Sequence, residues 1–100
     1  MKLVGIMSLK EHRTIVRDVL QNQGVQIFSE TDILGHTTET LAKIGWFATP
    51  QSTPEYSTLC FAIVPDENAG PILDAFAKLG PTDDTGHPIR AFLVPVERMV

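Results

Sequence analysis

Pro81–Arg90, "PTDDTGHPIR", holds the side chains in this sequence that are best suited to binding an anion. Gly86 can bring backbone N–H groups close to a negatively charged group, and Arg90 offers a planar set of donors that matches phosphate. Thr85 adds a hydroxyl group. The two aspartates of the stretch argue against an anion unless they face away or hold a cation. The alternative is a polar turn before a strand.

A second stretch, Gly35–Tyr56, is far longer than a hairpin turn requires. It separates two apolar runs that are typical of strands, and it contains Trp46 and Phe47. Large aromatic side chains in a loop either pack against the body of the protein or contact a partner. Because long loops with little regular structure are usually functional, we expect this one to bind a partner or to be ordered by a ligand.

The sequence shows no pattern typical of an active site. His12, His36 and His87 are widely separated, and no second histidine or cysteine lies at helical i, i+4 spacing from any of them. We expect His12 on an exposed first helix turn and Cys60 as a buried structural thiol. No G-x-S-x-G motif is present to supply a nucleophile. We therefore predict no enzyme activity, no catalytic residues and no metal site.

The composition predicts a single domain over residues 1–100. Its 43% hydrophobic and 20% charged residues are ordinary for a globular chain. The net charge is −4 and no basic stripe is visible, which argues against nucleic-acid binding. The apolar start "MKLVGIMSLKEH" is too short for a signal peptide. We expect a cytoplasmic protein.

The first half of the chain predicts a strand, a helix and a second strand. Lys2–Ser8 is a short apolar run that suits a buried strand. Ser8 and Glu11 have the spacing of a capping box at the start of a helix, and Gly24 is a suitable stop. Val25–Leu34 then alternates like a half-buried strand. The residues expected on the core face of the helix are Ile15, Val16, Val19 and Leu20.

The second half repeats the same order of elements, a strand, a helix and a strand. Ser57–Val64 is a strongly apolar strand, and Asp66 or Asn68 can cap the helix that follows, with Pro71 in its first turn. Ile89–Val96 is the last strand. The residues expected on the core face of this helix are Ile72, Leu73, Phe76 and Leu79.

The order β-α-β-β-α-β predicts an α+β, ferredoxin-like fold, in which two helices cover one face of a four-stranded antiparallel sheet. The strands are apolar on both sides, which indicates that the second face of the sheet is also buried. Either further copies of the chain or the long loop would cover it, and we favour an oligomer. The residues on which this depends are Leu59, Phe61, Ile63, Leu93 and Val94.

Taken together, these stretches resemble the PII and PII-like signalling proteins along nearly the whole chain. The matching stretches are "MKLVGI", "RDVLQNQGVQ", "SETDILGH", "VPDENAGPILDAF" and, most specifically, "TGHPIRAFLVPVERMV". The family consists of trimers with a ferredoxin-like subunit. A protruding loop docks on a membrane transporter, an enzyme or a regulator, and an adenine nucleotide in the cleft between subunits sets its conformation.

The resemblance implies roles for individual residues. The positions that it places at the nucleotide are Ser29, Gly35, Val64, Thr85, Gly86 and Arg90. The protruding loop would lie at about 35–56, and the partner-binding positions within it would be His36, Glu39, Trp46 and Phe47. Recruitment to the membrane surface through a transporter is a further implication, and no cofactor is required.

Departures from the nitrogen-regulatory members narrow the expected effector. Glu39 stands where those members have a glutamine that helps to hold Mg²⁺ and 2-oxoglutarate, and its charge would repel a dicarboxylate. Two arginines that follow "PVE" in those members are matched by Arg98 alone. We therefore expect ADP or AMP rather than ATP, or a small anion such as bicarbonate.

Three functional hypotheses follow. The first is a non-enzymatic regulator that binds an adenine nucleotide and acts on a partner through the loop. The second is a trimeric interaction module that needs no ligand. The third is a metal-tolerance protein of the CutA type, which shares the trimeric fold, and the lack of a His/Cys cluster makes it the least favoured.

Overall fold

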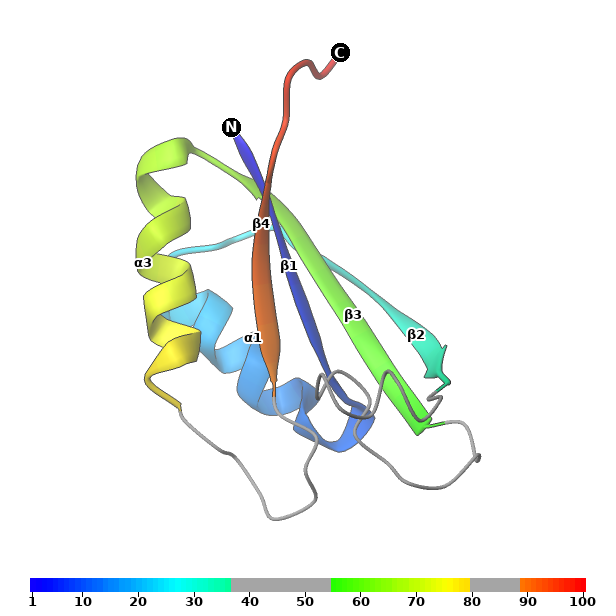
Figure 1. The fold of residues 1–100 in the computed structure, drawn as a ribbon. Helices are drawn as coiled ribbons and strands as arrows, with labels where there is room; N and C mark the ends of the chain where they lie inside the picture. Colours follow the sequence, from blue (N-terminus) through cyan, green and yellow to red (C-terminus); the bar gives the residue numbers. More distant parts are fainter. Residues whose placement is uncertain (37–54, 80–88) are drawn as a thin grey trace.

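In a computed structural model of the protein, the described residues are 1–36, 55–79 and 89–100 (Figure 1). Within these ranges the predicted order of elements is confirmed. In chain order the elements are β1 (Lys2–Leu9), the 3₁₀ helix η1 (Lys10–His12), α1 (Arg13–Asn22), β2 (Ser29–Gly35), β3 (Glu55–Val64), α3 (Asp66–Ala77) and β4 (Arg90–Pro95).

The four strands form one antiparallel sheet in the order β2-β3-β1-β4. The central strand β1 pairs with β3 on one side and with β4 on the other, so that Lys2 lies opposite both Val64 and Pro95. Figure 1 shows α1 and α3 on the same side of this sheet. The predicted ferredoxin-like α+β fold is therefore confirmed.

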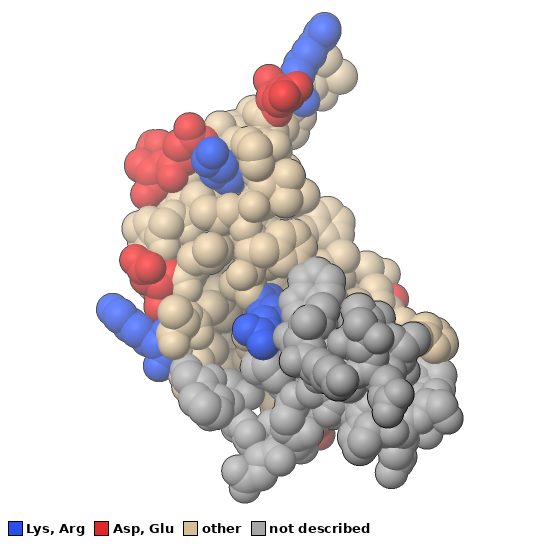
Figure 2. Space-filling model, viewed as in Figure 1, with Lys and Arg blue, Asp and Glu red and all other residues tan. Residues whose placement is uncertain are grey.

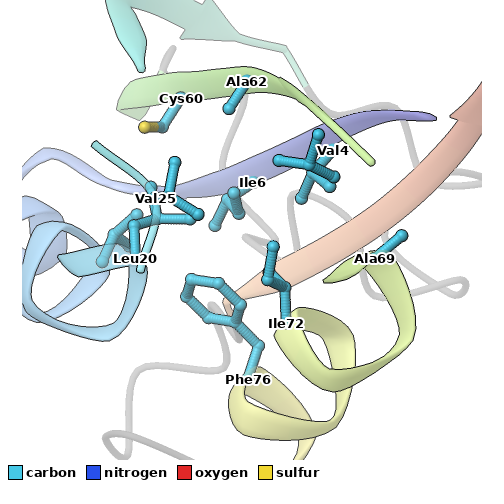
Figure 3. Packing of buried hydrophobic residues seen from close by; sticks show 11 residues of the cluster. Val4, Ile6, Leu20, Val25, Cys60, Ala62, Ala69, Ile72 and Phe76 are labelled. Carbon is cyan, nitrogen blue, oxygen red and sulfur yellow. The ribbon is translucent and has the colours of Figure 1, made fainter. Parts of the chain in front are cut away.

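The hydrophobic core lies between the sheet and the two helices (Figure 3). Alternate residues of β1 point into it, because successive side chains of a strand face opposite sides. Burying each large aliphatic side chain contributes about 1.5–3 kcal/mol relative to an exposed position. The fully buried side chains of largest volume are Ile6, Leu20, Ile72, Val4 and Cys60.

The predicted start of the first helix is wrong. Ser8 belongs to β1, which continues to Leu9, and no side chain caps η1 or α1. His12 ends η1 and is buried, whereas we expected it on an exposed turn. The Ser-x-x-Glu pattern is typical of a helix start. Here, however, strand β1 includes Ser8 and continues to Leu9, so Ser8 does not cap the helix. The predicted stop is confirmed, because Gly24 adopts φ 80° just after α1.

The remaining boundaries differ by a few residues from those predicted. β2 begins at Ser29 rather than Val25, since Val25 is buried while Ile27 is 85% exposed, which breaks the expected alternation. Pro71 lies inside α3 at its sixth residue, beyond the first turn. Leu79 follows the helix and is exposed, so it does not belong to the core face.

The sheet face away from the helices is apolar and partly exposed. Leu93 faces the helices and packs against the core, whereas its neighbour Val94 lies on the opposite face. Phe61, Ile63 and Val94 lie on the open face and are 39–42% exposed. Figure 2 shows a mostly uncharged surface over the middle of the molecule, with basic groups within it and acidic groups mainly at its margins.

Candidate functional site

Arg90 is the first residue of β4 and is exposed. It lines a cavity of about 360 Å³ between α3 and β4, which we call the Arg90 cavity. Asp74 of α3 lines the same cavity, so an acidic and a basic residue both border it. The other lining residues are apolar or small: Leu73, Phe76, Ala77, Ile89 and Ala91. Thr85 and Gly86, the two predicted partners of Arg90, lie outside the described residues.

A second cavity of about 220 Å³ lies at the far end of β3, and we call it the Val64 cavity. The chain after α1, the end of β3 and the start of α3 form its walls. Gln26 and Asn68 bring amide groups that both donate and accept hydrogen bonds, and Ile27 and Ile63 bring apolar surface. The remaining lining residues are Gly24, Val25, Val64 and Pro65.

The composition of the Val64 cavity suits a planar heterocycle. Apolar side chains can cover the faces of such a ring, and amide or backbone groups can bond its edge. The sequence reasoning pointed to Val64 but missed Gln26, Ile27 and Asn68. The residue types at these positions do not indicate a shared cavity in the sequence. Three separate segments of the chain form the cavity, and only the fold brings these segments together.

Ser29 and Gly35, the predicted root residues of the long loop, occupy opposite ends of β2. Ser29 is exposed and pairs with Phe61, while Gly35 is buried and pairs with Glu55. The six residue steps between them span about 20 Å. One chain therefore holds these two positions well apart.

Arg90 and Val64 are also separated within one chain. Met7 of β1 pairs with Arg90 on one side and with Leu59 on the other, which places Arg90 level with Leu59. Val64 lies five residues further along β3, about 17 Å away along the strand. The two cavities are thus distinct regions of a single subunit.

The root of the long loop carries exposed apolar side chains that the sequence reasoning did not single out. Leu34 and Tyr56 are register partners on β2 and β3 and are 54% and 70% exposed. Tyr56 also lines a cavity of about 280 Å³ with Leu9, Lys10 and Glu11. His36 follows β2 and is exposed. The other predicted partner-binding residues, Glu39, Trp46 and Phe47, lie outside the described residues.

Two ion pairs join β2 to the first helical segment. Arg17 donates to both carboxylate oxygens of Glu30, with 3.1 Å between Nε and Oε2. Lys10 Nζ lies 3.1 Å from Asp32 Oδ2. The hydrogen bond from Arg17 lowers the pKa of the Glu30 carboxyl and, reciprocally, raises the pKa of the guanidinium group.

Cys60 is buried in β3, as expected, and burial raises the pKa of its thiol to about 11. Across the described part of the chain, His, Cys, Asp and Glu side chains form no group of three that could hold a metal ion. No helix in the same ranges is both long and apolar enough to span a bilayer.

No protein-family model matches this sequence, and no curated protein matches it. Among solved structures, the chain is similar in fold to CPII, a nitrogen regulatory PII-like protein from Thiomonas intermedia K12. That structure was determined with ADP, AMP and bicarbonate bound. The match has a TM-score of 0.65 and 20% sequence identity, and it covers 99% of this chain and 94% of CPII. This chain therefore shares its overall fold with CPII.

Proposed function

We propose that residues 1–100 form a single PII-like domain that acts as a non-enzymatic regulator. The protein works as a homotrimer and binds ADP or AMP, in preference to ATP, or a small anion at the clefts between subunits. Occupancy of the clefts controls a partner, a transporter or an enzyme, through the loop at about 35–56. The observation that carries the proposal is the end-to-end likeness in fold to a protein solved with ADP, AMP and bicarbonate.

The two cavities support a nucleotide as the effector. The Val64 cavity offers amide groups and apolar surface, which suit an adenine ring. Arg90 supplies a guanidinium group for a phosphate, and Thr85 and Gly86 would add a hydroxyl and backbone donors. Because Val64 and Arg90 lie far apart within a chain, the ligand groups that they bind would come together between neighbouring subunits.

The open sheet face supports self-association. Phe61, Ile63 and Val94 expose apolar surface on the same face of the sheet. Monomeric proteins rarely leave a large continuous apolar patch in contact with water. Uncharged apolar surface is complementary to a second copy of itself, so we assign further copies of this chain as its occupants.

A titration calorimetry experiment on the full chain tests the effector. We expect AMP or ADP to bind with a dissociation constant below about 1 mM, which corresponds to about 4 kcal/mol. Arg90→Ala should weaken binding about 10-fold or more, since it removes a charge-assisted hydrogen bond. Lys78→Ala, a matched loss of an exposed cation near the end of α3, should leave affinity unchanged. If neither nucleotide nor bicarbonate binds below that limit, the effector part of the proposal is wrong.

Light scattering tests the assembly. The chain has a mass of 11.0 kDa, and we expect a particle of about three times that mass. Ile63→Glu places a charge on the apolar face and should yield monomers, whereas Ile15→Glu on α1 should not. A wild-type monomer at micromolar concentration would contradict the trimer.

One observation favours the second candidate, a trimeric interaction module that needs no ligand. Asp74 shares the Arg90 cavity, and its charge opposes phosphate binding there. Fluorescence of Trp46 separates the two candidates. A loop that responds to the effector should change the Trp46 emission on addition of ADP or AMP, and a loop that binds its partner constitutively should not.

A further inference from the structure

β2 is an edge strand that contributes no buried side chain to the protein. Its residues are exposed from Ser29 to Asp32, Ile33 is half-buried, and the buried Gly35 has no side chain. Leu34 is 54% exposed. Hydrophobic burial therefore contributes little to holding β2 on the sheet, and its ladder with β3 lies at the rim.

The opposite edge strand, β4, is held in a different way. Ala91 and Leu93 pack against the core from the helix-facing side. On the open side, the ring of Phe92 lies over Gly5 of the central strand. Both faces of β4 thus make apolar contacts, which β2 lacks. The two edges provide an internal comparison within one molecule.

Ion pairs join β2 to the helical layer. Glu30 and Asp32 point toward the helices and meet Arg17 and Lys10, and we refer to these contacts as the β2 ion pairs. Both pairs are solvent-exposed to a large extent, so dissolved salt screens them. Segments with few buried apolar contacts and exposed backbone hydrogen bonds open locally at lower free energy than the whole domain.

We propose that β2 opens from the sheet as a separate unit while β1, β3, β4 and both helices stay folded, and that the β2 ion pairs set how often it opens. Raising the salt concentration, or neutralising the two carboxylates, favours the open state. Cys60 lies opposite Glu30 in the register and is 2% exposed with β2 in place. Opening of β2 therefore uncovers the thiol of Cys60.

Amide hydrogen exchange of the full chain, without any nucleotide, tests this proposal. In the wild-type protein the ladder amides of β2 should exchange at least 10-fold faster than those of β1 and β4. The double variant Glu30→Gln, Asp32→Asn should accelerate amide exchange in β2 about 3-fold or more. The reason is that an exposed ion pair typically changes an equilibrium constant by about 1.5- to 5-fold. Amides of β1 and β4 should change less than 2-fold. Asp18→Asn, which removes one carboxylate charge from the exposed surface of α1, should leave exchange in β2 unchanged.

A salt series on the wild-type protein is the second arm and needs no variant. Between about 0.05 and 0.5 M NaCl, exchange in β2 and labelling of Cys60 by a thiol reagent should rise together, with no matching rise in β4. Equal protection of β2 and β1 would overturn the proposal. So would an equal effect of the double variant on all strands, or labelling of Cys60 only at the rate of global unfolding.

The consequence for regulation rests on the proposed function. Ser29 and Gly35 lie at the two ends of β2, so an effector that contacts either position would bind the closed strand. Nucleotide should then slow exchange in β2 selectively. Because the exchange experiment is done without nucleotide, its outcome is independent of whether the protein binds one.

Discussion

The ring of Phe92 occupies the space that a side chain on Gly5 would need. A β-carbon placed on Gly5 would lie 2.2 Å from Cζ of Phe92, far closer than any van der Waals contact. The two residues are register partners on adjacent strands, β1 and β4. Absence of a side chain at Gly5 is thus what lets the ring pack over this position on the open face of the sheet.

Gly5→Ala should therefore destabilise the protein. We expect a loss of about 1–3 kcal/mol in the free energy of unfolding, because the ring must move out of a packed position. Urea denaturation measures the loss. In a Phe92→Leu background the same substitution should cost clearly less, and an unchanged cost would show that the ring is not the cause.

Gly24 should tolerate asparagine better than alanine. Its φ of 80° lies in the left-handed region, which costs an alanine about 1–2 kcal/mol and an asparagine less. No atom lies within 4 Å of a β-carbon built at this position, so backbone conformation alone decides the difference. Thermal unfolding of Gly24→Ala and Gly24→Asn checks this. Equal destabilisation by both variants would contradict the conformational explanation.

Ile72 and Ile27 form a matched pair of buried and exposed isoleucines, at 0% and 85% exposure. Ile72→Ala should cost about 2–5 kcal/mol, since it removes core contacts and leaves a cavity. Ile27→Ala should change the free energy of unfolding by less than about 0.5 kcal/mol. A large loss at Ile27 would mean that another copy or another segment covers this side chain in solution.

Ionisation of Cys60 should lower the stability of the folded protein at alkaline pH. Burial raises the thiol pKa from 9.0 to about 11, so the folded state favours the protonated form. The stabilisation is fully present below about pH 9 and is lost as the pH rises toward about 11. Cys60→Ala should remove this part of the pH dependence, as measured by urea denaturation at several alkaline pH values. An unchanged profile would exclude Cys60 as its source.

Glu30 should make the stability of the folded protein depend on pH in the acidic range. The hydrogen bond from Arg17 lowers its pKa below the ordinary 4.5, and the charges of Arg13 and Arg17 act in the same direction. Its contribution is present above pH 4.5 and is lost as the pH falls through the lowered value. Glu30→Gln should therefore make stability less dependent on pH in that range. A steeper dependence in the variant would contradict this sign.

The sequence was sufficient to predict the fold class because the apolar periodicities are strong. Val16 and Leu20 are buried at the predicted helical spacing, and alternate residues of Ser57–Val64 face the core. Starts of elements were less predictable. The Ser8 capping pattern is a local signal, and the pairing of β1 with β3, which extends to Leu9, overrides it.

The candidate site was predictable only in part, for a geometric reason. The resemblance implied Ser29 and Val64, and side-chain chemistry suggested Arg90. Their separation follows from strand register, which a single sequence does not contain. The amide groups of Gln26 and Asn68 come from the connection after α1 and from the start of α3, 42 positions apart (68 − 26). Nothing in either local sequence indicates that they share a cavity.

The central place of β1 in the sheet also bears on how the protein is made. β1 is synthesised before its neighbours, yet Val64 and Pro95, the partners of Lys2, emerge much later. At roughly 5–20 residues per second, a nascent chain leaves both edges of this central strand unpaired for several seconds. The sheet cannot close around β1 until residues 90–95 have left the ribosome, so shielding by chaperones should matter most in that interval.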